Sequence, residues 1–210
     1  MTLAAGFAGG IAALDVGVDP AAQATLLDYV ALLEKWNRTY NLTAIRQRAR
    51  IVTHHLLDSL AVLPHLPQSA SLRLVDIGSG AGLPGIPIAV ARPAWHLALL
   101  DSNEKKTAFL RQAVAELGLG NVEVVAKRAE QYEPPRPFDA AISRAYSDVS
   151  AFATHARRLT GPGGRWFAMK GAYPAAELAQ LPRDVLVTRV AQLEVPGVRA
   201  QRHLVAMEAA

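Results

Sequence analysis

Cysteine is absent from this chain of 210 residues. Its absence excludes disulfides, thiolate metal ligands and cysteine nucleophiles, and it fits a reducing compartment. Long apolar runs are also missing. The apolar start, residues 1–14, is interrupted by glycines and lacks the basic segment of a signal peptide. We therefore expect a cytoplasmic protein with no membrane partner, whose first residues form a frayed or loosely packed terminus.

The composition nevertheless provides for a packed core and a basic surface. Apolar residues make up 51% of the sequence, and the net charge is +4. Such a charge is compatible with a polyanionic partner but does not establish one. Residues 35–57 contain no Asp or Glu and five basic side chains: Lys35, Arg38, Arg46, Arg48 and Arg50. This segment is either a solvated helical surface or a patch that contacts phosphates.

The first 66 residues are predicted to form a helical extension. Asp19 and Pro20 suit the N-cap and the first turn of a helix, and apolar residues from Leu26 to Trp36 then recur at helical spacing. A second helix is expected over residues 51–63.

Residues 67–210 are predicted to form one compact α/β unit. Strands are expected over residues 72–77, 95–100, 122–127, 138–143 and 165–169, with helices ending near 91 and spanning 103–117 and 148–159. Two last strands, over 185–195 and 203–208, are expected to pair as an antiparallel hairpin. The pattern predicts a mostly parallel, seven-stranded Rossmann-like sheet with helices on both faces. In such sheets ligands bind at the carboxyl ends of the strands.

A glycine loop follows the first of these strands. Gly78, Gly80 and Gly82 allow the backbone to turn sharply and to approach a ligand closely. An acidic residue two positions before the first glycine, here Asp76, is typical of methyltransferase loops that bind S-adenosylmethionine (SAM). These glycines and the following Leu83 are therefore candidate cofactor contacts.

A dinucleotide site is the competing interpretation of this loop, because Gly80, Gly82 and Gly85 satisfy the G-x-G-x-x-G pattern. In a dinucleotide fold, however, the first glycine closes the strand, and counting from Gly78 the sixth position is not glycine. Pro84 also removes an amide that a pyrophosphate would use. The loop therefore favours SAM over NAD.

Two further positions are candidates for holding a nucleoside. Asp101 ends the second strand, where a carboxylate accepts hydrogen bonds from ribose hydroxyls; it would do so for SAM or NAD, and it could instead serve only the next helix N-terminus. Ala129 and Glu130 follow the third strand, where residues commonly bracket an adenine, although Glu130 could simply face solvent.

Together these residues resemble the small-subunit rRNA guanine-N7 methyltransferase G family, also called glucose-inhibited division protein B. The resemblance covers residues 26–208. Its most specific carriers are the runs Lys-Trp-Asn-Arg-Thr-Tyr-Asn-Leu-Thr-Ala-Ile at 35–45, His-His-Leu-Leu-Asp-Ser-Leu at 54–60 and Ile-Ser-Arg-Ala at 142–145. The glycine loop, Leu-Asp-Ser at 100–102, Met-Lys-Gly at 169–171 and Arg-His-Leu-Val at 202–205 add to it.

This resemblance implies methyl transfer from SAM to guanine N7 in 16S rRNA, at the nucleotide conventionally numbered 527. It implies that 16S rRNA or the small ribosomal subunit is the partner. The resemblance also implies SAM contacts at Gly78, Leu83, Ala129, Glu130 and Arg144. The chain departs from the family pattern after Ala145, where Tyr146, Ser147 and Asp148 stand in place of small or apolar residues; this departure bears on the target-base side.

The residues agree with N7 chemistry. Methylation at C5 of a pyrimidine needs a cysteine nucleophile, which is lacking, and the Asp/Asn-Pro-Pro-aromatic turn of many amine methyltransferases is absent after the fourth strand. Guanine N7 carries an unprotonated lone pair, so alignment with the methyl group, worth about 7–11 kcal/mol, is sufficient without a general base. Ribose and amine acceptors also lack sequence hallmarks, so this agreement does not exclude them.

Arg144, at the end of the fourth strand, is the positioning candidate. Its guanidinium suits the SAM carboxylate, or guanine O6 and a phosphate, or a structural ion pair. Candidate RNA contacts are Lys35, Arg38, Asn41, Arg46, Arg48, Lys170 and Arg202, with Arg50 and Arg199 on the same basic face. Asn41 could instead cap the turn that follows it, and Trp36 and Tyr40 could pack in the core or stack on bases.

A metal site is not expected, because the adjacent His54 and His55 point to different sides of a helix and cannot both face one ion with Asp58. We expect a monomer. The rival functions are methylation of a small molecule or protein, an NAD-linked oxidoreductase, and a non-catalytic RNA-binding factor.

Overall fold

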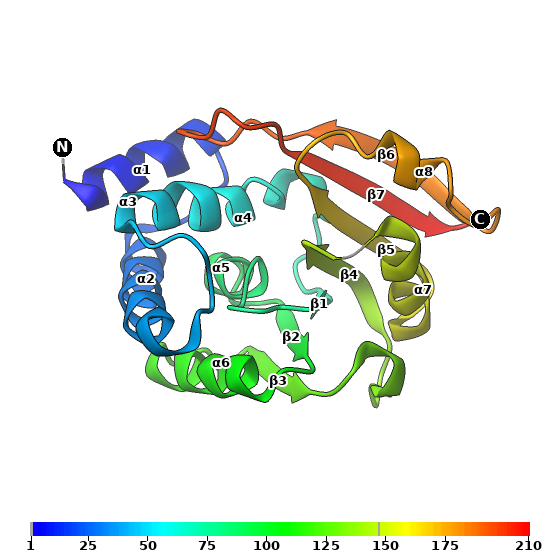
Figure 1. Cartoon of the computed structure of the whole chain (residues 1–210), viewed down its shortest axis with the longest axis horizontal. Helices are drawn as coiled ribbons and strands as arrows, with labels where there is room; N and C mark the ends of the chain where they lie inside the picture. The colour runs from blue at the N-terminus through cyan, green and yellow to red at the C-terminus, as the bar shows by residue number, and fades with distance from the viewer. Residues whose placement is uncertain (1, 147) are drawn as a thin grey trace.

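A computed structural model of the chain describes residues 2–146 and 148–210. Its centre is a seven-stranded sheet with the strand order β3-β2-β1-β4-β5-β7-β6 (Figure 1). The strands are β1 (Arg73–Ile77), β2 (His96–Asp101), β3 (Val122–Ala126), β4 (Phe138–Arg144), β5 (Thr160–Lys170), β6 (Val185–Gln192) and β7 (His203–Ala209). Strands β1 to β5 run parallel, and β7 pairs antiparallel with both β5 and β6. The predicted Rossmann-like sheet and its terminal hairpin are confirmed.

Helices cover both faces of this sheet. The α-helices are α1 (Leu3–Leu14), α2 (Pro20–Tyr40), α3 (Arg48–Ile51), α4 (Asp58–Leu60), α5 (Gly85–Ala91), α6 (Glu104–Glu116), α7 (Val149–Leu159) and α8 (Ala175–Leu178). One buried cluster joins α1, α2, α5 and α6 to one face, and a second packs α7 against the other. The strand order reverses between β1 and β4, so the carboxyl ends of these two strands form the place where ligands bind in such sheets.

Local signals in the sequence explain the main helices. Asp19 accepts a hydrogen bond from the backbone of Ala22, so it is the N-cap of α2, as expected. Asn103 caps α6 in the same way through the amides of its second and third residues. Gly118, just beyond α6, has a φ of 65°, the left-handed conformation that suits glycine after a helix.

The N-terminal segment is not frayed, and that prediction is wrong. Residues Leu3–Leu14 form a regular helix, α1, with Phe7 and Ile11 buried. Gly10 faces Leu57, and a Cβ at position 10 would lie 2.5 Å from a methyl carbon of that leucine. The glycine therefore permits a close approach of two helical segments, where the sequence suggested a break. Met1 lies outside the described residues.

The helix expected over residues 51–63 is also different. It begins at Arg48 in α3, continues as the π-helical turn η1 (Val52–Leu57) and ends with Leu60 in α4, before the 3₁₀ turn η2 (Leu63–His65). A π-helical turn holds an extra residue, so it changes the direction in which the following side chains point. The turn thereby decides where His54, His55 and Asp58 lie.

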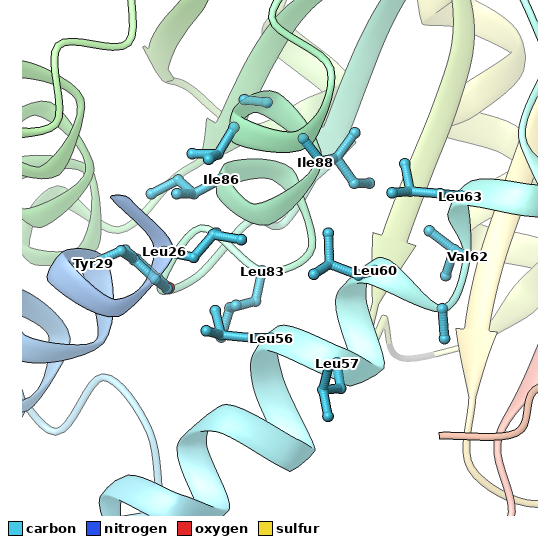
Figure 2. Packing of buried hydrophobic residues seen from close by; sticks show 14 of the residues in the cluster. Leu26, Tyr29, Leu56, Leu57, Leu60, Val62, Leu63, Leu83, Ile86 and Ile88 are labelled. Atoms are coloured by element: carbon cyan, nitrogen blue, oxygen red, sulfur yellow. The ribbon is translucent and has the colours of Figure 1, made fainter. Parts of the chain in front are cut away.

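The helical extension shares its core with the sheet domain. Figure 2 shows Leu26 and Tyr29 of α2, Leu56 of the π-helical turn and Leu60 of α4 in one cluster with Ile86 of α5, next to the glycine loop. These side chains are all fully buried. A boundary near residue 66 therefore separates two segments of the chain that fold around one apolar cluster. No helix of the described residues is long and apolar enough to cross a bilayer.

Gly85, the first residue of α5, tests how tightly the glycine loop packs. A Cβ there would lie 2.2 Å from Leu99 Cδ2 and 2.8 Å from Asp76 Oδ2. We expect Gly85→Ala to lower the free energy of unfolding by about 1–3 kcal/mol through overpacking. Gly9→Ala is the control, because nothing lies within 4 Å of its added carbon and alanine favours a helix. Urea unfolding measures both, and equal stabilities of the two variants would contradict this account.

Candidate functional site

The loop after β1 needs its glycines. Gly78, Gly80 and Gly82 have φ values of 73°, 59° and 86°, in the left-handed region that side chains with a Cβ rarely adopt. The loop turns the chain from β1 into α5 at the carboxyl edge of the sheet. The conformational reason for placing glycine at these three positions is therefore confirmed.

Three side chains from different elements hold this loop. Asp76 accepts a hydrogen bond from the Gly85 amide at 2.9 Å. Asp101, at the end of β2, accepts one from the Gly80 amide, also at 2.9 Å. The third comes from the helical extension: the buried hydroxyl of Tyr29 donates to the Ala81 carbonyl at 2.6 Å. Since each contact satisfies a loop backbone group, the loop has one defined shape before any ligand binds.

Asp76 is fully buried. Burial raises its pKa to about 7, against the opposing effect of the Gly85 hydrogen bond. Its Oδ1 atom is buried without a hydrogen-bond partner among the described residues. The carboxyl group is therefore close to half protonated near neutral pH.

The first cavity, which we call the Asp101 cavity, has a volume of about 170 Å³ and lies beside Gly78. It is lined by Ile77, Gly78, Leu100, Asp101, Ser102, Lys127, Arg128, Ala129, Glu130 and Tyr146. The Asp101 carboxylate, 8% exposed, accepts hydrogen bonds from the loop and from the Asn103 amide. It keeps acceptor capacity for hydroxyl groups on its cavity side, since a carboxylate has about four acceptor positions.

Most of the predicted cofactor residues meet at this cavity. Gly78, Asp101, Ala129 and Glu130 line it. Gly80 lies against it through its hydrogen bond to Asp101. Glu130 both lines the cavity and reaches solvent, where it pairs with His155.

Besides Gly80, which contacts Asp101 but is not a lining residue, three more predicted cofactor residues do not line the Asp101 cavity. Gly82 lies against Ile86, and the Leu83 side chain is buried in the apolar cluster of Figure 2. Arg144 lines a different cavity, described below. The roles of these residues as SAM contacts remain predictions.

Tyr146 lines the Asp101 cavity, although the sequence associated this residue with the target-base side of the site. Its ring stands 3.8 Å from the Cβ position of Gly78 and packs against Phe152 and His155. The departure from the family pattern therefore contributes a wall of the Asp101 cavity. Ser147, the next residue of that departure, lies outside the described residues.

The second cavity, which we call the Arg144 cavity, has a volume of about 380 Å³. It combines the end of β4, the end of β5, the start of β7 and the π-helical turn. It is lined by Ile45, His54, His55, Asp58, Arg144, Ala145, Met169, Lys170, Gly171, Leu193, Arg202 and His203. The cavity thus brings together three predicted cationic residues that lie far apart in the sequence: Arg144, Lys170 and Arg202.

Ala145 is the point where the two cavities meet. It has a φ of 62°, which is uncommon for a residue with a Cβ. The preceding Arg144 lines the Arg144 cavity, and the following Tyr146 lines the Asp101 cavity. The left-handed residue after β4 therefore separates the side chains on either side of it into two cavities.

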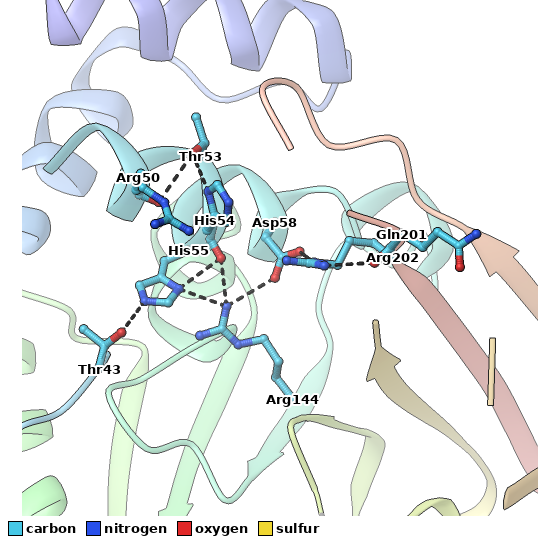
Figure 3. Close-up of polar contacts among 9 residues, drawn as sticks. All are labelled: Thr43, Arg50, Thr53, His54, His55, Asp58, Arg144, Gln201 and Arg202. Carbon is cyan, nitrogen blue, oxygen red and sulfur yellow. Dashed lines mark hydrogen bonds and ion pairs between the residues drawn. The ribbon is translucent and has the colours of Figure 1, made fainter. Parts of the chain in front are cut away.

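A buried carboxylate joins the two arginines of the Arg144 cavity. Figure 3 shows Asp58 between them: Arg144 Nη1 donates to Asp58 Oδ2 at 3.2 Å, and Arg202 Nε donates to Oδ1 at 2.7 Å. The Asp58 side chain is 4% exposed. The structural ion pair considered for Arg144 is therefore present, and sequence reasoning weighed Asp58 only as a metal ligand.

His55 links this cluster to the basic segment. Its Nδ1 lies 3.0 Å from the His54 carbonyl, and its Nε2 lies 2.7 Å from the Thr43 hydroxyl. The Thr43 amide in turn donates to Asn37 of α2. Burial, followed by the nearby Arg144 charge, lowers the pKa of His55 to about 4. His55 is therefore neutral near pH 7, with one ring nitrogen donating a hydrogen bond and the other accepting one.

The predicted RNA contacts fall into two groups. Lys35, Arg38, Asn41, Arg46 and Arg48 are exposed on the helical extension. Within this group Arg48 pairs with Glu34, and Asn41 caps α2 with a φ of 49° while it accepts a hydrogen bond from Arg46. Lys170, in the second group, pairs with Glu177 at 2.7 Å. Their contacts with RNA stay predictions.

The sequence left open whether Trp36 and Tyr40 pack in the core or stack on bases, and the structure shows how each of them packs. Trp36 is partly buried against Phe109 of α6, as expected for a core residue. Tyr40 stacks on Trp36 but remains 42% exposed. In the part of the chain that the structure describes, no three His, Asp or Glu side chains gather as metal ligands.

Comparisons with known proteins agree with this architecture. A crystal structure of a SAM-dependent methyltransferase from Aquifex aeolicus is 19% identical, with a TM-score of 0.59 over 77% of this chain and 93% of that chain. With its glycine loop and acidic strand ends, the chain has the Rossmann-like fold of the SAM-dependent methyltransferases.

The sequence comparisons then specify the family. The family model of rRNA small subunit methyltransferase G (GidB) matches residues 22–205. The Ribosomal RNA small subunit methyltransferase G of Laribacter hongkongensis is 52% identical over 93% of each chain, and that of Chromobacterium violaceum is 56% identical over 85% of each. This chain belongs to the rRNA small subunit methyltransferase G family.

The pKa of Asp76 predicts a pH dependence of stability. Because the folded state holds this proton up to about pH 7 and the unfolded state releases it near its model value of 3.8, the folded state binds more protons between these limits. Asp76 therefore lowers stability progressively as pH rises through this window. Asp76→Asn removes the titration, so its stability relative to wild type should increase from pH 4 to pH 7.

Thermal unfolding of both proteins across this range measures the difference. The comparison with wild type is needed because His55, whose pKa is depressed, acts oppositely: its contribution is present above pH 6.5 and is lost as pH falls towards 4. Because His55 is unchanged in both proteins, its contribution cancels in the difference between their stabilities. A constant difference between the two curves would show that Asp76 does not titrate in this window.

Proposed function

We propose that this protein transfers the methyl group of SAM to N7 of a guanine in 16S rRNA, at the nucleotide indicated by the family resemblance. The observation that carries the proposal is the junction at Ala145, where a cavity suited to a nucleoside adjoins a cavity lined by cationic side chains. A donor and an acceptor held in these two cavities would meet at the end of β4.

The Asp101 cavity suits the adenosine part of SAM. Asp101 offers a buried carboxylate for ribose hydroxyls, and Ala129 and Glu130 lie where an adenine is bracketed. Gly78 has no side chain, which leaves room beside the carboxylate, and the Tyr146 ring bounds this room 3.8 Å from the Cβ position of Gly78. When bound, SAM supplies an electrophilic methyl group on a positively charged sulfur.

The Arg144 cavity suits an anionic acceptor that needs no general base. Arg144, Lys170 and Arg202 supply positive charge for RNA phosphates or for the acceptor edge of guanine. Four groups of the cavity resemble a base, and each has partners in the protein: His55 is hydrogen-bonded at both ring nitrogens, and Asp58 is paired with two arginines. His54 Nδ1 lies 2.7 Å from the Thr53 hydroxyl, and His203 Nδ1 lies 2.8 Å from the Gly171 carbonyl. Guanine N7 requires only alignment of its lone pair with the methyl group, so the residues present are sufficient for this reaction.

The exposed basic residues of the helical extension extend the same side of the site. The Thr43–His55 contact connects their loop directly to the Arg144 cavity. RNA that enters the cavity would therefore also contact this segment. Because such contacts release counterions, affinity for rRNA should fall steeply with salt, which separates this proposal from methylation of a small molecule or protein.

Asp101 provides a test of the cofactor site. Asp101→Ala removes a charged acceptor, and hydrogen bonds to charged groups contribute about 1.5–3 kcal/mol, so we expect SAM affinity to fall roughly 10–150-fold. Calorimetric titration of the wild type and the variant measures the change, and thermal unfolding shows whether the variant remains folded. Titration of the wild type with NAD should give no binding; NAD binding in place of SAM would contradict the proposal.

The reaction itself is tested on ribosomes that lack the modification. Small subunits, and 16S rRNA extracted from them, are prepared from cells without this gene and incubated with the protein and labelled SAM. We expect label at N7 of one guanine in at least one substrate, mapped by chemical cleavage at 7-methylguanine. Label at another atom or in another class of molecule, or binding without transfer, would identify one of the rival functions.

A further inference from the structure

We propose that Asp58 is a positioning residue that combines Arg144 and Arg202 into one phosphate-binding site for the RNA acceptor. This inference rests on the proposed function and assigns a role to a residue that touches neither reacting group. It begins from the unusual position of Asp58, a carboxylate buried between two guanidinium groups, one at the end of β4 and the other just before β7 (Figure 3).

The charges of the cluster require such a carboxylate. Arg144 and Arg202 both line one cavity, and their side chains are only 21% and 22% exposed. Two guanidinium ions that share a partly desolvated space repel each other, and solvent screens this repulsion only weakly. Asp58 contacts both, so it offsets the repulsion and leaves the trio with a net charge of +1. That charge is suited to a single phosphodiester.

The geometry leaves donors free for a ligand. Asp58 accepts hydrogen bonds from Nη1 of Arg144 and from Nε of Arg202. Nη1 of Arg144 also contacts the His54 carbonyl and the His55 ring. Nη1 of Arg202 contacts the Gln201 carbonyl. Nη2 of each arginine makes no hydrogen bond within the described residues. Each guanidinium is therefore fixed along one edge while N–H groups remain for an anion, a fork that suits phosphate oxygens.

Asp58 is itself firmly placed. It is the first residue of α4, directly after the π-helical turn, and the neighbouring Leu57 and Ser59 are buried. A carboxylate on this packed segment can fix arginines that arrive from β4 and from the residue before β7. The helical extension thereby takes part in the acceptor site without needing to touch the reacting atoms.

The central test is Asp58→Asn, which keeps the size of the side chain and removes its charge. We expect kcat/KM for methylation of unmodified small subunits to fall about 10–100-fold, because small displacements of positioning groups have effects of this order. The affinity for SAM should stay within roughly threefold of wild type, since Asp58 and both arginines lie outside the Asp101 cavity. Asp58→Glu, which retains the charge, should recover part of the activity.

A matched control comes from a surface ion pair. Asp184 also pairs with an arginine, Arg157, but it is 61% exposed and lines neither cavity. Asp184→Asn should therefore leave kcat/KM, SAM affinity and salt dependence unchanged. Thermal unfolding of both variants gives the folded fraction by which rates are divided.

Two further readouts separate positioning from a merely structural role. If Asp58 acts by preparing a phosphate contact, the slope of log kcat/KM against log salt should become shallower by about one in Asp58→Asn. The factor lost on Asp58→Asn should also be smaller in an Arg202→Ala background, since one of the two groups that Asp58 holds is already gone. A structural role would leave the slope unchanged and give the same factor in both backgrounds.

The outcomes distinguish this inference from the proposed function. If the wild type transfers no methyl group to guanine N7, the proposed function is wrong. If the wild type does so and Asp58→Asn matches it, or loses activity with an unchanged salt slope and the same factor in both backgrounds, the role of Asp58 is overturned. A parallel loss of SAM affinity would also overturn it.

Discussion

A hydrogen bond from the Gly85 amide to the buried carboxyl of Asp76 closes the turn between β1 and α5, and the start of that turn lines the Asp101 cavity. The contact brings the start of a helix against the end of a strand so closely that position 85 has no room for a Cβ. Burying a carboxyl is costly, and this one responds by holding its proton to a higher pH. In return, the glycine loop has a fixed backbone conformation, in which the Gly80 amide contacts Asp101.

The helical extension completes what this loop begins. Tyr29 satisfies a loop carbonyl from one side, while Asp58 reaches the arginines on the other. Both residues lie on helical segments that share one apolar cluster with the sheet, so their positions are set by close packing. A sheet of this class without the extension would lack the buried hydroxyl, the carboxylate and much of the lining of the Arg144 cavity. The extension is therefore part of the site.

At Ala145 a single left-handed residue determines which cavity each of its two neighbours enters. A regular continuation of β4 would point successive residues to opposite faces of the sheet, so that Arg144 and Tyr146, two positions apart, would share a face. The left-handed residue instead sends Arg144 into one cavity and Tyr146 into the next. Proximity of donor and acceptor then follows from the covalent chain itself, which suits a reaction whose main requirement is alignment.

The sequence by itself determined the order of strands and helices, the glycine turn and the family, because these depend on local periodicity, on glycine's left-handed conformations and on short runs such as residues 54–60. It also singled out Gly78, Asp101, Ala129 and Glu130, which line one cavity because residues after parallel strands meet at one edge; their contacts with SAM stay a prediction. It did not predict the ordered α1, the π-helical turn, or the burial of Leu83 away from the Asp101 cavity.

Only the tertiary structure decided how Asp58 pairs. Its partners Arg144 and Arg202 lie 86 and 144 residues away, and no local rule connects such positions. The ion pairs form because packing of the helical extension on the sheet leaves one carboxylate and two guanidinium groups in a shared, partly dry space, where each charge requires the others.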